Sequence, residues 1–158
     1  LNGVEPGAYR LNVSGLPDGL YVRTIRYGRN DALENPVEIR EKAADVLEIQ
    51  LAPGAGTLEG LVTDSQGRPL PGAAVALVPL AQFRGRADLY RSTATDQFGK
   101  FSFKGITPGD YKLFSWEDIE PGDYYNPDVL AISERLSQAV RIEPGGRASL
   151  SARAAPAQ

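Results

Sequence analysis

The chain contains no histidine, no cysteine and no methionine among its 158 residues. These absences exclude an imidazole base, a thiolate nucleophile and a zinc site built from nitrogen and sulfur ligands. Only carboxylate, hydroxyl or lysine chemistry remains, and neither a G-x-S-x-G nor an S-x-x-K motif occurs. We therefore expect no enzyme: no catalytic residue, no cofactor and no metal site.

Long apolar runs and a strong charge of one sign are also missing. No segment approaches the roughly 18 apolar residues needed to span a bilayer, and no charged and then apolar leader opens the chain. The net charge is −3, from 17 basic and 20 acidic residues that are interspersed. This gives no basic field for nucleic acid or for an anionic membrane. Two arginine groups are expected to be solvated: Arg23, Arg26 and Arg29, and Arg84, Arg86 and Arg91.

An internal repeat is the clearest feature of the sequence. Residues 1–11 (LNGVEPGAYRL) align with residues 103–113 (FKGITPGDYKL) with five identities. Residues 37–51 align with residues 140–154 at equal spacing, although few residues are identical. Such self-similarity indicates tandem modules. We interpret residues 1–53 as the C-terminal half of a first module and residues 54–158 as a complete second module.

The second module reads as short strands separated by turns. Phe101 and Phe103 alternate with polar residues, and Val75 and Leu77 share a face, so all four are expected in the core. Gly99 is expected in the left-handed conformation of a hairpin turn. About seven strands favour an all-β, two-layer Greek-key sandwich of the prealbumin or immunoglobulin type. The strands lie within residues 57–63, 73–78, 89–95, 100–106, 107–114, 140–142 and 150–152.

One short helix is predicted near residues 128–138. Asn126 would cap it and Pro127 would take its first position. Val129, Ile132 and Leu136 would share one face of the helix, as the helical period requires. We expect this helix to be a surface insertion.

Residues 56–79 (GTLEGLVTDSQGRPLPGAAVALVP), residues 95–113 (TDQFGKFSFKGITPGDYKL) and the closing strands resemble the carboxypeptidase regulatory-like module. The resemblance covers residues 56–154, and the repeat extends it to one and a half tandem copies. It implies a transthyretin-like sandwich of the kind found in secreted and cell-surface bacterial proteins. Members of the family range from stalks and adhesin segments to accessory domains, so the resemblance specifies fold more than function.

The related collagen-adhesin B-type repeats often carry a crosslink between a lysine and an asparagine. This sequence departs from that pattern, because residues 57–63 contain no lysine and residues 148–154 contain no asparagine. We expect no such crosslink.

Tyr9 and Tyr111 each follow a Pro-Gly turn by two residues, in EPGAY and TPGDY. This spacing resembles the tyrosine corner of Greek-key sandwiches, in which the phenol bonds a nearby backbone group. Both tyrosines are therefore expected to be structural, since a buried tyrosine needs such a partner.

The segment 115–128 (SWEDIEPGDYYNPD) is the most distinctive polar and aromatic stretch. Trp116, Tyr124, Tyr125 and Asp123 are its candidate ligand-binding residues, because aromatic faces beside hydrogen-bonding groups stack on sugars. Clustered carboxylates could instead hold calcium, but their spacing matches no calcium loop. The third interpretation is that the aromatic residues pack at the sheet edge while the acids stay solvated. Residues 79–90 are a candidate binding loop by position alone.

The half-module predicts contacts with other strands, because a few strands with a bare apolar face are not stable in water. The missing strands would come from an upstream part of the same polypeptide or from a neighbouring subunit, or the chain has lost them. We therefore expect a non-catalytic structural or adhesive spacer, or an assembly subunit, located at the cell surface, outside the cell or in the periplasm of a bacterium. Its partners would be neighbouring modules or subunits. The alternatives are a carbohydrate-binding module that contacts polysaccharide, and an accessory domain of a secreted enzyme or outer-membrane receptor.

Overall fold

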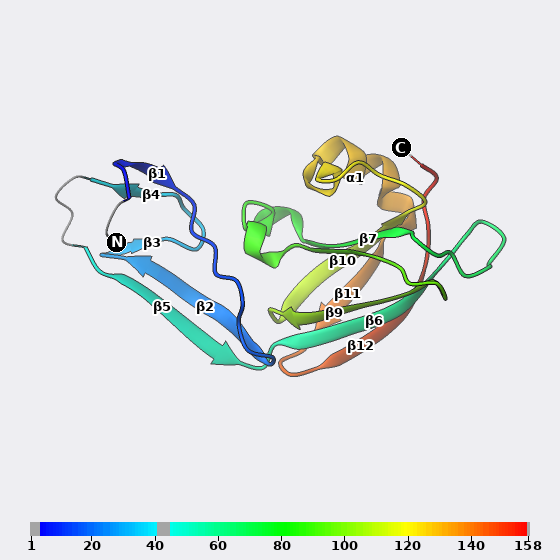
Figure 1. Ribbon diagram of the computed structural model, residues 1–158, viewed down its shortest axis with the longest axis horizontal. Coiled ribbons are helices and arrows are strands. Elements are labelled where there is room, and N and C mark those ends of the chain that lie inside the picture. The colour runs from blue at the N-terminus through cyan, green and yellow to red at the C-terminus, as the bar shows by residue number, and fades with distance from the viewer. Residues whose placement is uncertain (1–3, 41–44, 158) are drawn as a thin grey trace.

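A computed structural model describes residues 4–40 and 45–157 (Figure 1). In these residues the secondary structure is mostly β, with one α-helix and short 3-10 helices. No helix in this part of the chain is long and apolar enough to cross a membrane. The repeat positions 1–3 and 41–44 lie outside the described residues. We refer to residues 4–40 and 45–53 as the N-terminal region and to residues 56–157 as the C-terminal sandwich.

The C-terminal sandwich consists of two packed sheets. One sheet has the strand order β11-β10-β7-β8 and the other has the order β12-β6-β9. All seven predicted strands are present, which confirms the all-β sandwich. Strand β6 lies between β12, to which it is parallel, and β9, to which it is antiparallel. The strands are β6 (Gly56–Thr63), β7 (Ala74–Pro79), β8 (Arg91–Ala94), β9 (Lys100–Ile106), β10 (Gly109–Trp116), β11 (Gln138–Ile142) and β12 (Arg147–Arg153).

The core of the sandwich lies between these two sheets. Phe101 and Phe103 are 5% and 4% exposed, as their alternation predicts, and they pack with the fully buried Leu58, Leu77 and Leu113. Burying one side chain of this size stabilises the fold by roughly 1.5–3 kcal/mol. This cluster is therefore the main source of stability in the sandwich.

The four-stranded sheet is covered on both faces. Val75 and Leu77 of β7 point into the core, whereas Ala76 and Val78 belong to a second apolar cluster on the outer face. That cluster includes Leu130 of the helix α1 (Pro127–Ser133). The continuous apolar sequence of β7 follows from burial on both faces, since a strand with one wet face alternates instead.

The helix differs from the prediction in length and in its buried face. Asn126 caps α1 by accepting a hydrogen bond from the backbone nitrogen of Asp128 at 2.9 Å, and Pro127 is the first helical residue. The helix ends at Ser133 and is followed by the 3-10 helix η4 (Glu134–Leu136). The face that Val129, Ile132 and Leu136 were predicted to share is not the face that packs on the sheet, because Ile132 is 70% exposed and Leu136 is 37% exposed. The helix instead buries Leu130 and Ser133, so it covers the sheet.

The N-terminal region repeats part of the strand pairing of the C-terminal sandwich. In β1 and β4, Gly7 lies opposite Ile39 and Tyr9 opposite Val37. In β10 and β11, the aligned residues pair in the same way, Gly109 with Ile142 and Tyr111 with Val140. The repeat in the sequence is therefore also a repeat of register. The strands of this region are β1 (Gly7–Tyr9), β2 (Leu20–Tyr27), β3 (Asn30–Asp31), β4 (Val37–Ile39) and β5 (Leu47–Pro53), and its second sheet has the order β3-β2-β5.

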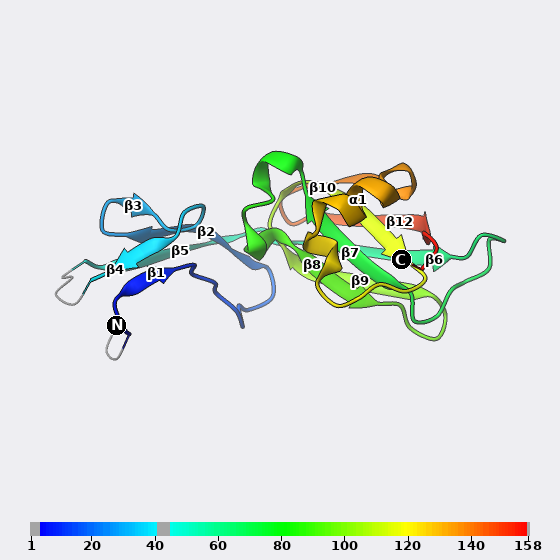
Figure 2. The same ribbon diagram turned by 90° about the horizontal axis from the view of Figure 1, so that it is seen from above.

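Backbone hydrogen bonds hold the junction between the two regions. Gly54 adopts a φ of 100°, which favours glycine, and β5 continues through it into β6 along the long axis of the molecule (Figures 1 and 2). Its nitrogen donates to the carbonyl oxygen of Gly19 at 2.8 Å, and its own carbonyl accepts from the nitrogen of Gly145 at 2.8 Å. The junction is thus bonded to one turn from each region.

Candidate functional site

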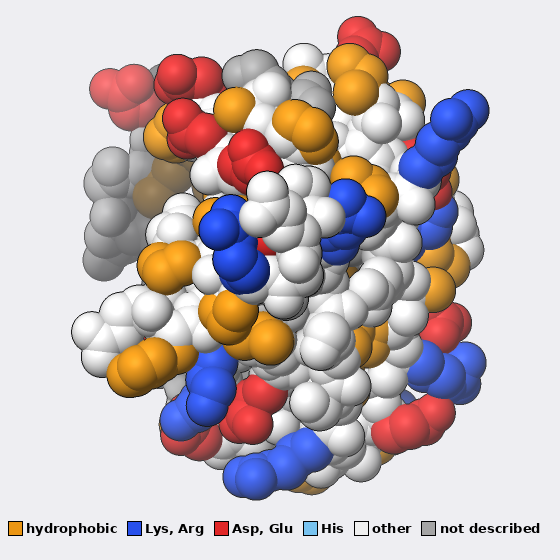
Figure 3. All heavy atoms as spheres, turned by 90° about the vertical axis from the view of Figure 1, so that its right-hand side faces the viewer, with side chains coloured by type: hydrophobic (Ala, Val, Ile, Leu, Met, Phe, Trp, Pro, Cys, Tyr) orange, Lys and Arg blue, Asp and Glu red, His pale blue; other side chains and the backbone are white. Residues whose placement is uncertain are grey.

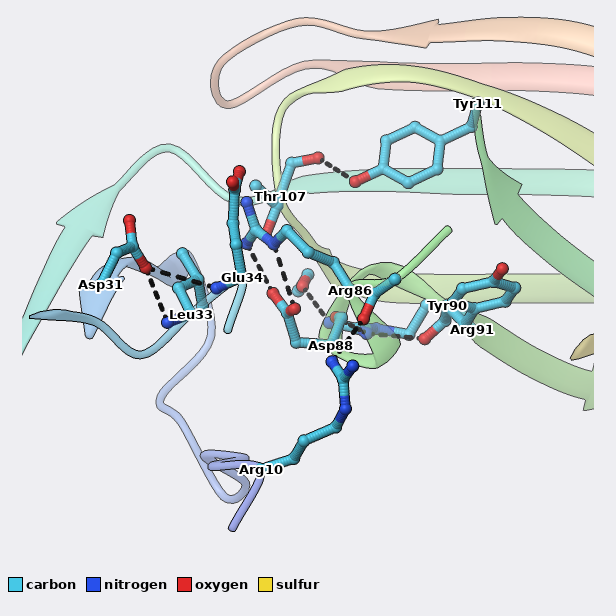
Figure 4. Close-up of polar contacts among 12 residues, drawn as sticks. Arg10, Asp31, Leu33, Glu34, Arg86, Asp88, Tyr90, Arg91, Thr107 and Tyr111 are labelled. Carbon is cyan, nitrogen blue, oxygen red and sulfur yellow. Dashed lines mark hydrogen bonds and ion pairs between the residues drawn. The ribbon is translucent and has the colours of Figure 1, made fainter. Parts of the chain in front are cut away.

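Tyr9 and Tyr111 occupy matching positions in the repeat. The hydroxyl of Tyr111 donates to the carbonyl oxygen of Thr107 at 2.7 Å (Figure 4). That of Tyr9 donates to the carbonyl oxygen of Glu5 at 2.9 Å. In both cases the acceptor lies four residues upstream, across the Pro-Gly turn. Tyr111 is 2% exposed, and burial raises its pKa to about 12, although the nearby Arg91 and Arg86 oppose that shift. The bond therefore fixes the turn before β10.

Trp116 is fully buried at the end of β10. Its indole nitrogen donates to the hydroxyl oxygen of Ser133 at 2.7 Å, and its ring stacks on Phe114 with centroids 5.6 Å apart. A ring without solvent-accessible area has no face on which a sugar can stack. The structure thus places Trp116 in the outer-face cluster beneath α1, as in the packing interpretation.

Tyr124 and Tyr125 form a cluster with Tyr90. The ring of Tyr125 is 4.6 Å from both Tyr90 and Tyr124, measured between centroids, and Tyr125 is 47% exposed. The hydroxyl of Ser92 donates to that of Tyr124 at 3.2 Å. Burial raises the pKa of Tyr125, and Tyr124 raises it further. The cluster of three tyrosines was not foreseen, because Tyr90 is distant in sequence.

Two hollows flank this tyrosine cluster. A cleft of about 430 Å³ lies between the two regions and is lined by residues 12–18 together with Arg91, Lys104 and Tyr125. A second, mostly apolar hollow of about 230 Å³ is bordered by Pro121 and Tyr124. Asp123 lines neither of them. Of the four candidate residues, the cleft thus includes Tyr125 and the hollow includes Tyr124, while Trp116 closes the inner wall of the hollow.

The candidate loop 79–90 is part of the contact between the two regions. It contains the 3-10 helices η1 (Ala81–Phe83) and η2 (Ala87–Leu89). Arg10 of the N-terminal region reaches the carbonyl oxygen of Gly85 with its Nη1 at 3.1 Å (Figure 4). The loop therefore contacts the preceding region of the same chain, a position that the sequence of the loop does not reveal.

Ion pairing and backbone contacts hold this loop in shape. Arg86 makes a bidentate pair with Asp88 (Nε–Oδ1 3.2 Å, Nη2–Oδ2 2.7 Å), and the two side chains are 15% and 18% exposed. Arg91 donates to the carbonyl oxygens of Asp88 and Tyr90, both at 2.8 Å, and to that of Gly105 at 2.9 Å. The expectation of solvated arginines was wrong for Arg86 and Arg91. A folded loop offers these donors more acceptors than a sequence pattern reveals.

The charged surface offers no single-signed patch on the face in Figure 3, where basic and acidic side chains are interspersed. Among the described residues, no three acidic side chains gather as ligands for a metal ion. The cleft is instead lined by the two tyrosines Tyr90 and Tyr125 and by charges of both signs, from Arg91, Lys104, Asp18 and Asp88. Such a set can hold a neutral polar molecule by stacking and hydrogen bonding.

One part of the chain, which contains Phe101, Phe103 and Tyr111, has a known sequence pattern. Residues 57–125 match the family model described as the carboxypeptidase regulatory-like domain. This segment resembles a carboxypeptidase regulatory-like module. The match begins in β6 and extends beyond β10, so it includes β6 to β10 of the C-terminal sandwich and confirms the resemblance found in the sequence.

Several solved structures are partly similar to the chain. The TIE protein of Bacillus anthracis is 13% identical over 75% of this chain and 20% of its own, with a TM-score of 0.44. A proposed carbohydrate-binding protein of Pseudomonas aeruginosa is 18% identical over 63% of this chain and 88% of its own (TM-score 0.43). The minor pilin GBS52 of Streptococcus agalactiae is 18% identical over 92% of this chain and 64% of its own (TM-score 0.43). No curated protein matches the chain in sequence.

Proposed function

We propose that the chain is a non-catalytic structural segment of tandem β-sandwich modules that spaces and presents its neighbours outside the cytoplasm. The observation that carries this proposal is the junction, where Gly54 is hydrogen-bonded to Gly19 on one side and to Gly145 on the other. We divide the modules at this point, between residues 53 and 54. A spacer needs a fixed joint, because a flexible linker would let the modules rotate independently.

A second contact supports the fixed joint. Arg10 bonds the carbonyl oxygen of Gly85 about 30 residues beyond the junction in sequence, and the loop that carries Gly85 is braced by the Arg86–Asp88 pair. Two separate points of attachment restrict rotation about the axis that joins the regions, whereas one point does not. The geometry thus favours a rigid, rod-like unit over two modules that reorient independently.

Residual dipolar couplings measured by NMR test the proposal. We expect couplings from both regions to fit one alignment tensor, since the joint is bonded at two places. A matched variant with four Gly-Ser residues inserted after Gly54 should give two tensors. If the unmodified chain already needs two tensors of different magnitude, the spacer function is rejected.

The assembly aspect of the proposal has its own test. The mass of the particle, measured by light scattering over about two decades of concentration, should grow with concentration if the module associates through its exposed strands. A constant monomer mass would restrict the chain to spacing within one polypeptide.

A carbohydrate-binding role is a second candidate, favoured by the half-exposed Tyr125 in the cleft beside Arg91 and Lys104. Its test is saturable binding to a glycan panel by the full chain. Tyr125→Ala should abolish that binding, while Ile132→Ala, an exposed residue of α1 that does not line the cleft, should leave it unchanged. Absence of saturable binding would remove this candidate.

A further inference from the structure

β5 is the outermost strand of its sheet, and no other strand pairs with its outer edge within the described residues (Figure 1). Ile49 and Leu51 on this strand are 46% and 40% exposed. Ile49 lies opposite Ile25 of β2, which is 1% exposed. The apolar inner face of the sheet therefore continues onto β5 without a cover, and such an edge is a template for pairing with another strand.

The backbone groups of β5 show which residues face this free edge. Next to the end of β2, the carbonyl oxygen of Val46 accepts a hydrogen bond from the nitrogen of Gly28 at 3.0 Å. Next to the start of β2, the nitrogen of Gly54 donates to the carbonyl oxygen of Gly19 at 2.8 Å. Peptide groups of successive residues in a strand point to opposite edges. The even-numbered residues of β5 therefore bond toward β2. The N–H and C=O groups of Leu47, Ile49 and Leu51 point to the free edge.

The internal repeat makes β12 the counterpart of β5. Residues 37–51 align with residues 140–154, so Leu47 corresponds to Leu150 and Ile49 to Ala152. Both pairs are inward-facing: Leu150 and Ala152 pack in the main core, and Leu47 packs against the N-terminal core. The two strands thus present equivalent faces.

The edge of β12 that bonds β6 corresponds to the free edge of β5. Thr57 of β6 donates to the carbonyl oxygen of Gly146 at 3.0 Å, and Ala154 donates to that of Thr63 of β6 at 2.9 Å. The even-numbered residues of β12 therefore bond β6. Because the alignment shifts numbers by 103, their counterparts are the odd-numbered residues of β5, whose peptide groups are free. The N-terminal region lacks a strand where the C-terminal sandwich has β6.

We propose that the free edge of β5 binds an extended polypeptide strand that runs parallel to β5 and has the chemistry of β6. This inference rests on the proposed function as a protein-contacting module and names the contact surface. A parallel strand would satisfy the free peptide groups and cover the exposed apolar residues in one step. It would place an apolar side chain beside Ile49, as Val62 lies beside Ala152 in the β6–β12 pair.

The β6–β12 ladder also defines the sequence pattern of the incoming strand. Leu58 and Val62 of β6 are fully buried, and Gly60 lies between them, opposite Leu150. A Cβ atom on Gly60 would lie 2.3 Å from the carbonyl oxygen of Leu150, which no side chain tolerates. The occupant therefore carries apolar residues two positions before and after a glycine, with the glycine opposite Leu47.

The test adds a synthetic peptide of the sequence GTLEGLVT, which is residues 56–63, to the full chain. Binding is followed by hydrogen exchange of individual amides and by line broadening from a spin label on the N-terminus of the peptide. We expect slower exchange at Leu47, Ile49 and Leu51, whose amides face the free edge. Broadening should be strongest at Val46, immediately before β5, because the strands run parallel.

Matched variants identify the surface. Ile49→Lys should weaken binding by about tenfold or more, because it places a charge in the apolar contact, whereas Gln50→Lys on the opposite face of the same strand should not. A peptide in which valine replaces its second glycine, the one that corresponds to Gly60, should also bind more weakly. Unchanged chemical shifts in β1–β4 show that the Ile49→Lys variant remains folded.

Each outcome decides the proposal. Protection of the odd-numbered amides with broadening at Val46 supports it. Broadening near Pro53 would mean an antiparallel strand and would overturn it, as would self-pairing of two copies through β5 or no binding at millimolar peptide. Because the dipolar couplings test the spacer function separately, a peptide that does not bind refutes the edge inference and leaves the spacer standing.

Discussion

Tyr111 donates its hydroxyl hydrogen to the carbonyl oxygen of Thr107 at 2.7 Å, across the turn that precedes β10. Because Tyr111 is 2% exposed, Tyr111→Phe leaves that carbonyl without its partner in the turn. We expect a loss of roughly 1–2 kcal/mol of unfolding free energy, as for a buried hydrogen bond. Urea unfolding followed by circular dichroism measures it.

Tyr9→Phe is the matched control, since the equivalent bond from Tyr9 to Glu5 lies at the exposed surface. Its effect should be clearly smaller, because water replaces the lost partner. Equal losses in the two variants would contradict the assignment of Tyr111 as the stronger of the two corners.

Alkaline pH should destabilise the protein through Tyr111. The unfolded chain releases the phenol proton near pH 10, whereas the folded protein holds it until about pH 12. Between these values the unfolded state binds fewer protons, so stability falls as pH rises through this window and is unaffected below it. The total loss from this group is about 3 kcal/mol. In Tyr111→Phe the slope of stability against pH should be shallower, and an unchanged slope would contradict the prediction.

Ser133→Ala should destabilise the outer-face cluster. The indole N–H of Trp116 would lose its acceptor, the hydroxyl oxygen of Ser133, in a fully buried site, which costs about 1–3 kcal/mol. Ser137→Ala serves as the control, because its hydroxyl bonds the carbonyl of Glu134 within its own turn and is only partly buried. Thermal unfolding of both variants gives the comparison, and equal midpoints would contradict it.

Gly60→Ala should disrupt the three-stranded sheet. The added Cβ would lie 2.3 Å from the carbonyl oxygen of Leu150 and 2.6 Å from the ring of Phe101, so β6 must shift away from β12. Overpacking of this kind costs about 1–3 kcal/mol or more. Gly85→Ala, where nothing lies within 4 Å, should change stability by less than about 0.5 kcal/mol. Denaturant midpoints of the two variants test the difference.

Much of the fold could be predicted because its signals are local. The alternation of Phe101 and Phe103 with polar residues predicts their strand, and the pair Asn126 and Pro127 predicts the start of α1. The end of that helix could not be predicted in the same way. Which face of the helix is buried depends on how the helix packs on the sheet. Leu130 and Ser133 are buried there, whereas Ile132 is exposed to solvent.

The candidate site was harder to predict, because it depends on contacts between distant segments. Trp116 and Tyr125 stand close in the sequence and look alike as aromatic residues, yet one is fully buried and the other is 47% exposed. Likewise, Arg91 looks like a solvated surface cation in the sequence, yet in the fold it donates to the carbonyl oxygen of Gly105, 14 residues away. Burial and pairing of this kind are set by the tertiary fold.

The parallel pairing of β6 with β12 has a mechanical consequence. A tensile load between the junction at Gly54 and the C-terminal end would pull on the start of β6 and the end of β12. Because these strands run parallel, from Thr57 opposite Arg147 to Thr63 opposite Arg153, the load acts along the strands and shears all their hydrogen bonds together. Antiparallel strands pulled from one end would instead unzip bond by bond. The C-terminal sandwich is therefore arranged to bear force along the axis of the tandem.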